Sequence, residues 1–110
     1  MNKFNIKEFI IDSLEDKKAE NIVIYSKEDF NISSNYVFIA SGRSTKNVCA
    51  IADNLSLELK KLGISSSIEG MARGEWVLLD FVDAMVHIFH PDTRVYYNLE
   101  ELYNGSSILK

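Results

Sequence analysis

Hydrophobic and polar positions alternate most regularly between residues 74 and 91. Two short apolar runs, residues 75–81 and 84–89, are rich in β-branched and aromatic side chains, and only two residues separate them. Runs of this kind, bounded by a glycine and a proline, are typical of the two strands of a hairpin. A two-residue loop then predicts the cross-strand pairs Trp76–Phe89, Leu78–His87 and Asp80–Met85.

The two faces of this predicted hairpin differ in chemistry, because successive side chains point to opposite faces of a strand. One face is wholly apolar and is expected to pack against helices: Val77, Leu79, Phe81, Ala84, Val86 and Ile88. The other, here called the mixed face, carries Trp76, Leu78, Asp80, Met85, His87 and Phe89. Such a composition favours a contact surface, so we predict that helices leave the mixed face uncovered. On periodicity alone, Trp76 could equally belong to the core.

Two longer helices are predicted where apolar residues recur at steps of three and four. The first spans residues 5–16, with Asn5 as its N-cap, and the second spans residues 44–62 and ends at Gly63. Shorter helices are expected to begin at Pro91 and, capped by Asn98, near the end of the chain. Residues 105–110 are expected to fray.

Further strands are predicted at residues 21–25, 36–41 and 64–69, with a polar loop over residues 26–35. The run 36–41 is almost continuously apolar, which is typical of an interior strand. The resulting order of elements predicts a fold of the α/β (α+β) class, a two-layer mixed β-sheet with helices mainly on one face. No repeat or linker divides the sequence, so residues 1–110 are expected to form one domain.

The charge balance restricts the kinds of partner. The net charge of −4 disfavours a protein that binds nucleic acid by neutralising phosphates, and favours a basic protein partner such as a ribosomal protein. The single Cys49 excludes an internal disulfide and a zinc site built from several cysteines. No apolar run reaches the roughly 18 residues of a membrane span, and a signal peptide is not expected, so we expect a cytoplasmic protein.

The candidate catalytic groups have unsuitable spacing. Asp80 and Asp83 could form the metal-binding pair of a nucleotidyltransferase, but a three-residue step across a strand end points the two carboxylates apart. His87 and His90 fail as metal ligands for the same reason. The turn at residues 42–44 lacks the further glycines and the lysine of a phosphate-binding loop. We therefore predict no catalytic residue, no metal ligand and no cofactor.

Four stretches carry a resemblance to a known family: residues 16–23, 36–44, 74–81 and 86–94. Together, in this order and spacing, they resemble the ribosomal silencing factor family, also called Iojap-related. The resemblance implies a nucleotidyltransferase-like topology without the catalytic carboxylates. It also implies a translational repressor that binds large-subunit ribosomal protein fourteen and blocks joining of the small and large subunits. The sequence departs from the family pattern in two places: Val82-Asp83 stands where a turn glycine is usual, and Tyr103 stands where tryptophan is common.

Our hypothesis is a repressor that acts by steric exclusion and needs no chemistry. The residues predicted to bind the ribosomal protein are Glu75, Trp76, Leu78, Asp80, Met85, His87 and Phe89. Trp76, Met85 and Phe89 would supply buried area. The carboxylates would pair with basic side chains of the partner, and the imidazole would form a hydrogen bond. Two alternatives stay open, a metal-dependent nucleotidyltransferase and a homodimeric interaction module; the repressor itself is expected to be a monomer or weak homodimer.

Overall fold

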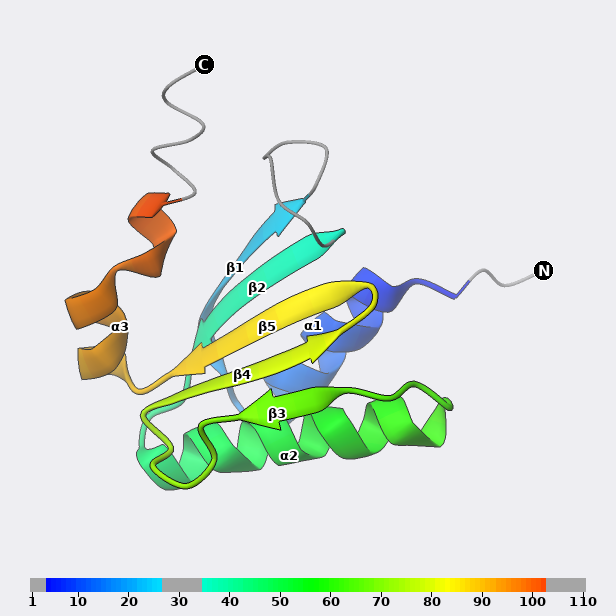
Figure 1. Ribbon diagram of the computed structural model, residues 1–110, viewed down its shortest axis with the longest axis horizontal. Helices are drawn as coiled ribbons and strands as arrows, with labels where there is room; N and C mark the ends of the chain where they lie inside the picture. Colours follow the sequence, from blue (N-terminus) through cyan, green and yellow to red (C-terminus); the bar gives the residue numbers. More distant parts are fainter. Residues whose placement is uncertain (1–3, 27–34, 103–110) are drawn as a thin grey trace, which may run out of the picture.

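The computed structural model describes residues 4–26 and 35–102 as a five-stranded sheet with three helices (Figure 1). The elements, in chain order, are α1 (Ile6–Asp16), β1 (Glu20–Ser26), β2 (Tyr36–Ser41), α2 (Thr45–Lys61), β3 (Ser67–Glu69), β4 (Trp76–Phe81), β5 (Ala84–Phe89) and α3 (Pro91–Tyr97). The strand order is β1-β2-β5-β4-β3, and only the β2–β5 pair is parallel. The predicted mixed two-layer fold is confirmed. The predicted loop lies almost wholly outside the described residues, as do Tyr103 and residues 105–110.

Helices α1 and α2 begin where side-chain caps satisfy their first free N–H groups. Asn5 accepts a hydrogen bond from the Glu8 backbone at 3.1 Å, and Ser44 accepts one from the Asn47 backbone at 3.0 Å. At the other end of α2, Gly63 has a φ of 81°, the left-handed conformation expected after a helix. The predicted bounds of both helices are therefore confirmed to within one residue.

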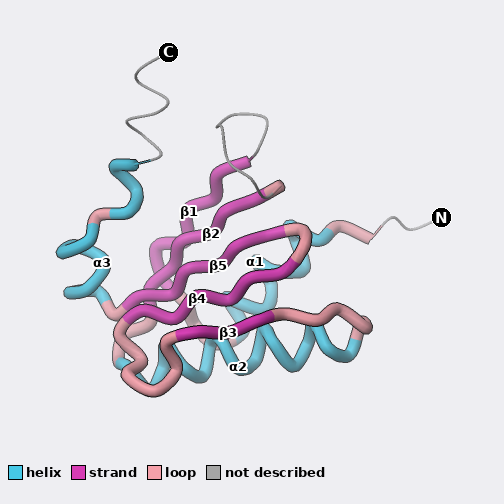
Figure 2. Tube along the Cα trace, viewed as in Figure 1, coloured by secondary structure: helices cyan, strands magenta, loops and turns pink. Residues whose placement is uncertain are grey.

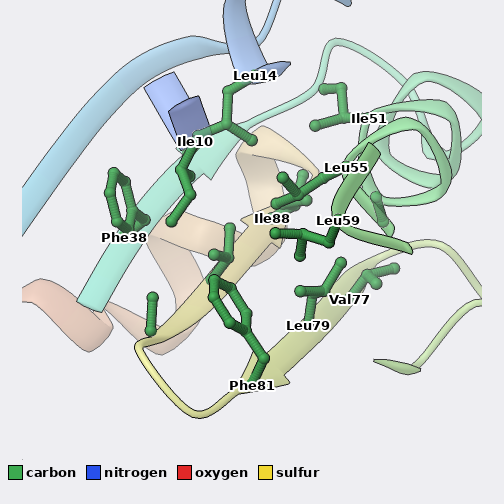
Figure 3. Close-up of a cluster of buried hydrophobic side chains, with 14 of the residues drawn as sticks. Ile10, Leu14, Phe38, Ile51, Leu55, Leu59, Val77, Leu79, Phe81 and Ile88 are labelled. Atoms are coloured by element: carbon green, nitrogen blue, oxygen red, sulfur yellow. The ribbon is translucent and has the colours of Figure 1, made fainter. Parts of the chain in front are cut away.

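The hydrophobic core lies between the sheet and these two helices. Figure 3 shows side chains of α1 and α2 pointing at those of the strands, among them Ile10, Leu14, Ile51, Leu55, Leu59, Phe38, Val77, Leu79, Phe81 and Ile88. All six residues of the predicted apolar face of the hairpin are buried, none more than 7% exposed. Burying such side chains stabilises the fold by about 1.5–3 kcal/mol each.

The hairpin has the predicted register. Trp76 pairs with Phe89, Leu78 with His87 and Asp80 with Met85. The pairing holds although the turn, Val82-Asp83, contains no glycine. Strand β2 lies between β1 and β5, so its predicted interior position is also confirmed.

Two predicted elements differ in detail. β3 covers only residues 67–69 of the predicted 64–69, because the Ile64 N–H donates to the carbonyl of Leu59 at 2.9 Å and so completes the end of α2. Asn98, predicted as the N-cap of the last helix, is also the C-cap of α3, with a φ of 46°. Its carbonyl accepts a hydrogen bond from the Glu101 N–H in the helical turn at residues 99–102. α3 itself starts at Pro91 as predicted, and it stands at the end of the sheet, apart from α1 and α2 (Figure 2).

Candidate protein-contact surface

The hairpin brings the predicted contact residues onto one face, but it does not expose all of them. Trp76, Leu78, Asp80 and Met85 are partly exposed, and Glu75, just before β4, is exposed. The prediction that the whole mixed face is uncovered is wrong for two members: His87 is 5% exposed and Phe89 is fully buried. Phe89 belongs to a second, smaller apolar cluster on this face, with Tyr25, Val37 and Ile39.

The indole of Trp76 is held in place from three directions. It stacks on the Phe89 ring, with centroids 5.0 Å apart and an angle of 27° between the planes. The ring of Tyr97 from α3 lies 4.8 Å away, and the indole N–H donates to Nδ1 of His87 at 3.1 Å. A side chain fixed in this way loses little conformational freedom when a partner binds.

The hydrogen bond from Trp76 determines which nitrogen of the neutral His87 ring carries the proton. Since Nδ1 accepts a hydrogen bond, the neutral ring carries its proton on Nε2. That buried Nε2 atom has no hydrogen-bond partner among residues 4–26 and 35–102. Burial lowers the pKa of His87 from 6.5 to about 4, while the nearby Asp80 carboxylate acts in the opposite direction. At neutral pH, the imidazole is therefore an uncharged support beneath the indole.

A pH-dependent stability follows from this lowered pKa. Between pH 6.5 and about 4 the unfolded chain binds a proton at His87 that the folded chain does not, so stability is complete above this window and falls as pH drops through it. At pH 5 we expect the free energy of unfolding to be about 2 kcal/mol lower than at pH 7.5 from this residue alone.

Urea unfolding of the wild type and of His87→Gln at both pH values measures this contribution. Glutamine can still accept the indole N–H but does not titrate, so subtracting its pH dependence removes the contribution of the carboxylates. Equal pH dependence in the two proteins would contradict the assignment.

Sequence reasoning missed α3 as part of this surface. Three consecutive large side chains on it are exposed: Val95 by 80%, Tyr96 by 81% and Tyr97 by 53%. Tyr97 touches Trp76, and the Tyr96 ring lies edge-on to Tyr97 with centroids 5.0 Å apart, so these two tyrosines continue the mixed face beyond the hairpin. Val95 lines a separate hollow with Asn21 and Ser41. A seven-residue helix gives almost no periodic signal, so the only clue in the sequence was the tyrosine pair itself.

Arg94 holds α3 against the sheet. Its guanidinium donates to the Ser41 hydroxyl at the end of β2, at 2.8 Å, and its Nε and Nη2 donate to the two carboxylate oxygens of Glu100, both at 3.0 Å. This charge-assisted pair lowers the pKa of the Glu100 carboxyl, with partial burial acting the other way. Arg94 thereby positions α3, which includes Tyr97.

Two hollows flank the indole and share Trp76 and Gly70. One, of about 500 Å³, is lined by Gly70, Ala72, Arg73, Glu75, Trp76, Thr93 and Tyr97. The other, of about 350 Å³, is lined by Glu69, Gly70, Trp76 and Leu78. Gly70 has a φ of 94°, and a Cβ there would lie 2.1 Å from the Trp76 carbonyl oxygen, so only glycine fits between the hollows.

The residues considered for catalysis lie in unrelated places. Asp80 faces the mixed face, whereas Asp83 is in the hairpin turn. His90 accepts a hydrogen bond from the Asp92 backbone N–H at 3.3 Å and so caps α3, whereas His87 supports the indole of Trp76. Within the described part of the chain, no three His, Cys, Asp or Glu side chains come together as metal ligands. Nor does any helix there have the length and apolar character to cross a membrane.

Known proteins resemble this chain over most of its length. The model of the family described as "Ribosomal silencing factor during starvation" matches residues 3–109. A "Ribosomal silencing factor RsfS" from Halalkalibacterium halodurans is 36% identical over 96% of this chain and 92% of its own. The mouse "Mitochondrial assembly of ribosomal large subunit protein 1" is 30% identical over 92% of this chain and 46% of its own. A crystal structure from Chromobacterium violaceum superposes with a TM-score of 0.85 at 32% identity, covering 94% of this chain and 88% of that one.

Proposed function

We propose, from the premise that this chain belongs to the ribosomal silencing factor family, that it represses translation by binding large-subunit ribosomal protein fourteen and blocking the joining of the two subunits. The observation that carries the proposal is a partly exposed tryptophan, fixed by Phe89, His87 and Tyr97 on a surface edged by carboxylates. The domain then occupies space that the small subunit needs, so no catalytic group is required. The cytoplasm is where we expect it to act.

The exposure of each residue divides the predicted contact residues into two groups. Glu75, Trp76, Leu78, Asp80 and Met85 are accessible enough to touch a partner directly. His87 and Phe89 support the indole from below instead. The two exposed tyrosines of α3, Tyr96 and Tyr97, enlarge the contact area.

The chemistry of this surface suits a basic ribosomal protein. Aromatic side chains supply the buried area of an interface, and complementary charges speed up encounter and fix orientation. The name of the mouse relative, which refers to assembly of the large ribosomal subunit, supports the choice of subunit.

A subunit-joining experiment tests the proposal. Purified small and large subunits are mixed with magnesium in the presence of increasing amounts of the protein, and the joined ribosomes are separated on sucrose gradients. We expect joining to fail once the protein is stoichiometric with large subunits, and the protein to co-sediment with that subunit alone. Normal joining at saturating protein would overturn the proposal.

Asp80→Lys should slow association and weaken its dependence on salt. The change reverses a charge on the mixed face, on the same strand as Trp76, and we expect the association rate at low salt to fall about three- to tenfold. Stopped-flow binding to large subunits at several salt concentrations measures the effect. Asp53→Lys, on the exposed surface of α2 across the sheet, is the matched control. If the association rate falls equally in both variants, the net charge of the protein is responsible and the position of Asp80 is not.

Self-association is a second candidate function for the same surface. Exposed apolar residues on α3 and the turn after it, including Tyr96 at 81% and Leu102 at 67%, could cover one another in a homodimer. Sedimentation velocity at several protein concentrations measures it: a concentration-dependent dimer that dissociates when large subunits are added would mean that both uses compete for one face.

A further inference from the structure

We propose that the hollow lined by Glu69, Gly70, Trp76 and Leu78 receives one arginine side chain of the bound protein partner. The guanidinium would stack on the indole and pair with the Glu69 carboxylate. This inference rests on the proposed function, since it identifies the partner group that the contact surface recognises.

The β3–β4 pairing places Glu69 on the correct side of the sheet. Glu69 is directly opposite Leu78, and directly opposed residues point to the same face. Glu69 is exposed and therefore presents its charge on the mixed face, one diagonal position from Trp76. The hollow thus combines a carboxylate, an aromatic ring and an aliphatic wall within one short stretch of the sheet.

The indole has a surface available for stacking. One face of its ring is packed on Phe89 of β5. Trp76 also lines the hollow on the side of β3, the strand that neighbours β4 on the side away from Phe89. A cation over an indole is attracted by the electron-rich ring face, and tryptophan is the best of the aromatic residues for this contact.

Charge distinguishes this hollow from its neighbour. The larger hollow already contains a cation, Arg73, which lies 3.5 Å from a carboxylate oxygen of Glu75. The smaller hollow has Glu69 as its one charged lining residue, so its negative charge is not neutralised from within. An anion such as a nucleic-acid phosphate is thereby disfavoured, and a cationic side chain is favoured.

Arginine fits this set of groups better than lysine. Its planar guanidinium can stack on a ring and at the same time donate two hydrogen bonds to a carboxylate, whereas lysine carries a compact, strongly hydrated charge. The methylene groups of the side chain would cover Leu78. Gly70 lets the chain that lines the hollow pass close to the Trp76 backbone, since a Cβ there would lie 2.1 Å from the Trp76 carbonyl oxygen.

Glu69→Gln tests the ion pair without removing the fold of the hollow. We expect binding to purified large subunits, measured by co-sedimentation, to weaken about five- to tenfold and to become less sensitive to salt. Asp53→Asn makes the same chemical change on α2, on the other side of the sheet, and should bind like wild type. If Glu69→Gln also binds like wild type while Trp76→Ala does not, the hollow is unused and the inference is wrong, but the proposed function stands.

A second measurement uses the free protein and identifies the cation. Trp76 is the only tryptophan, so the intrinsic fluorescence reports on this ring alone. N-acetylarginine amide should change the emission saturably at constant ionic strength, N-acetyllysine amide should bind at least about threefold more weakly, and Glu69→Gln should abolish the difference. Equal binding of both amides, or no saturable change with either, would overturn the inference whatever the ribosome experiment gives.

Discussion

Trp76→Ala is expected to weaken binding to the large ribosomal subunit by about 30- to 1000-fold. The indole is the largest partly exposed side chain of the mixed face, and losing a well-packed aromatic anchor lowers binding free energy by about 2–4 kcal/mol. The anchor is also pre-positioned by Phe89, His87 and Tyr97, so the wild type loses little side-chain entropy on binding.

Co-sedimentation with purified large subunits measures this loss, and circular dichroism checks that the variant is folded. Val82→Ala is a suitable control, because Val82 is 91% exposed at the far hairpin turn. Trp76→Phe separates the two roles of the indole, since it keeps an aromatic ring but removes the bond to His87. A folded Trp76→Ala protein that binds with wild-type affinity would show that the mixed face is not the contact surface.

Arg94→Met should lower the free energy of unfolding by about 2–3 kcal/mol. Breaking a largely buried charge pair leaves the other charge without its partner, and the side chains of Arg94 and Glu100 are only 10% and 26% exposed. The Ser41 hydroxyl also loses its donor. We further expect a red shift of Trp76 emission, because α3 would hold Tyr97 less firmly against the indole.

Urea unfolding of Arg94→Met, compared with that of the control Arg73→Met, measures the loss of stability. Arg73 and its partner Glu75 form an exposed pair, with side chains 81% and 51% accessible, and such pairs contribute little. If the two variants are equally stable, Arg94 does not position α3.

Much of the fold could be predicted because its signals are local. The two-residue break between the hairpin strands was enough to predict the register of all three mixed-face pairs. Asn5, Ser44 and Gly63 likewise mark helix ends through contacts made within a few residues. Alternation then separated the apolar face of the hairpin from the mixed face; burial confirms all six residues of the apolar face, but His87 and Phe89 of the mixed face are buried as well.

What could not be predicted depends on contacts between distant parts of the chain. The alternation of apolar and polar residues predicts which face of a strand a side chain is on, but not what packs over that face. The burial of His87 and Phe89 was therefore missed. The bond between Arg94 and Ser41 joins residues 53 positions apart, and no spacing rule predicts it. The length of β3 was overestimated because Ile64 completes the end of α2 instead of extending the strand.

The parallel pairing of β2 with β5 has a consequence for how the chain is made. Tyr36 pairs with Ala84 and Ser41 with Phe89, so β2 acquires its second neighbour only after nearly the whole described chain has been synthesised. Until then, an apolar strand has one unpaired edge while the polypeptide is still attached to a translating ribosome. Contacts this distant in sequence form slowly and leave aggregation-prone edges exposed. A nascent chain that stalls before residue 84 therefore leaves this edge of β2 unpaired, whereas a chain released after residue 89 contains both strands of the pair.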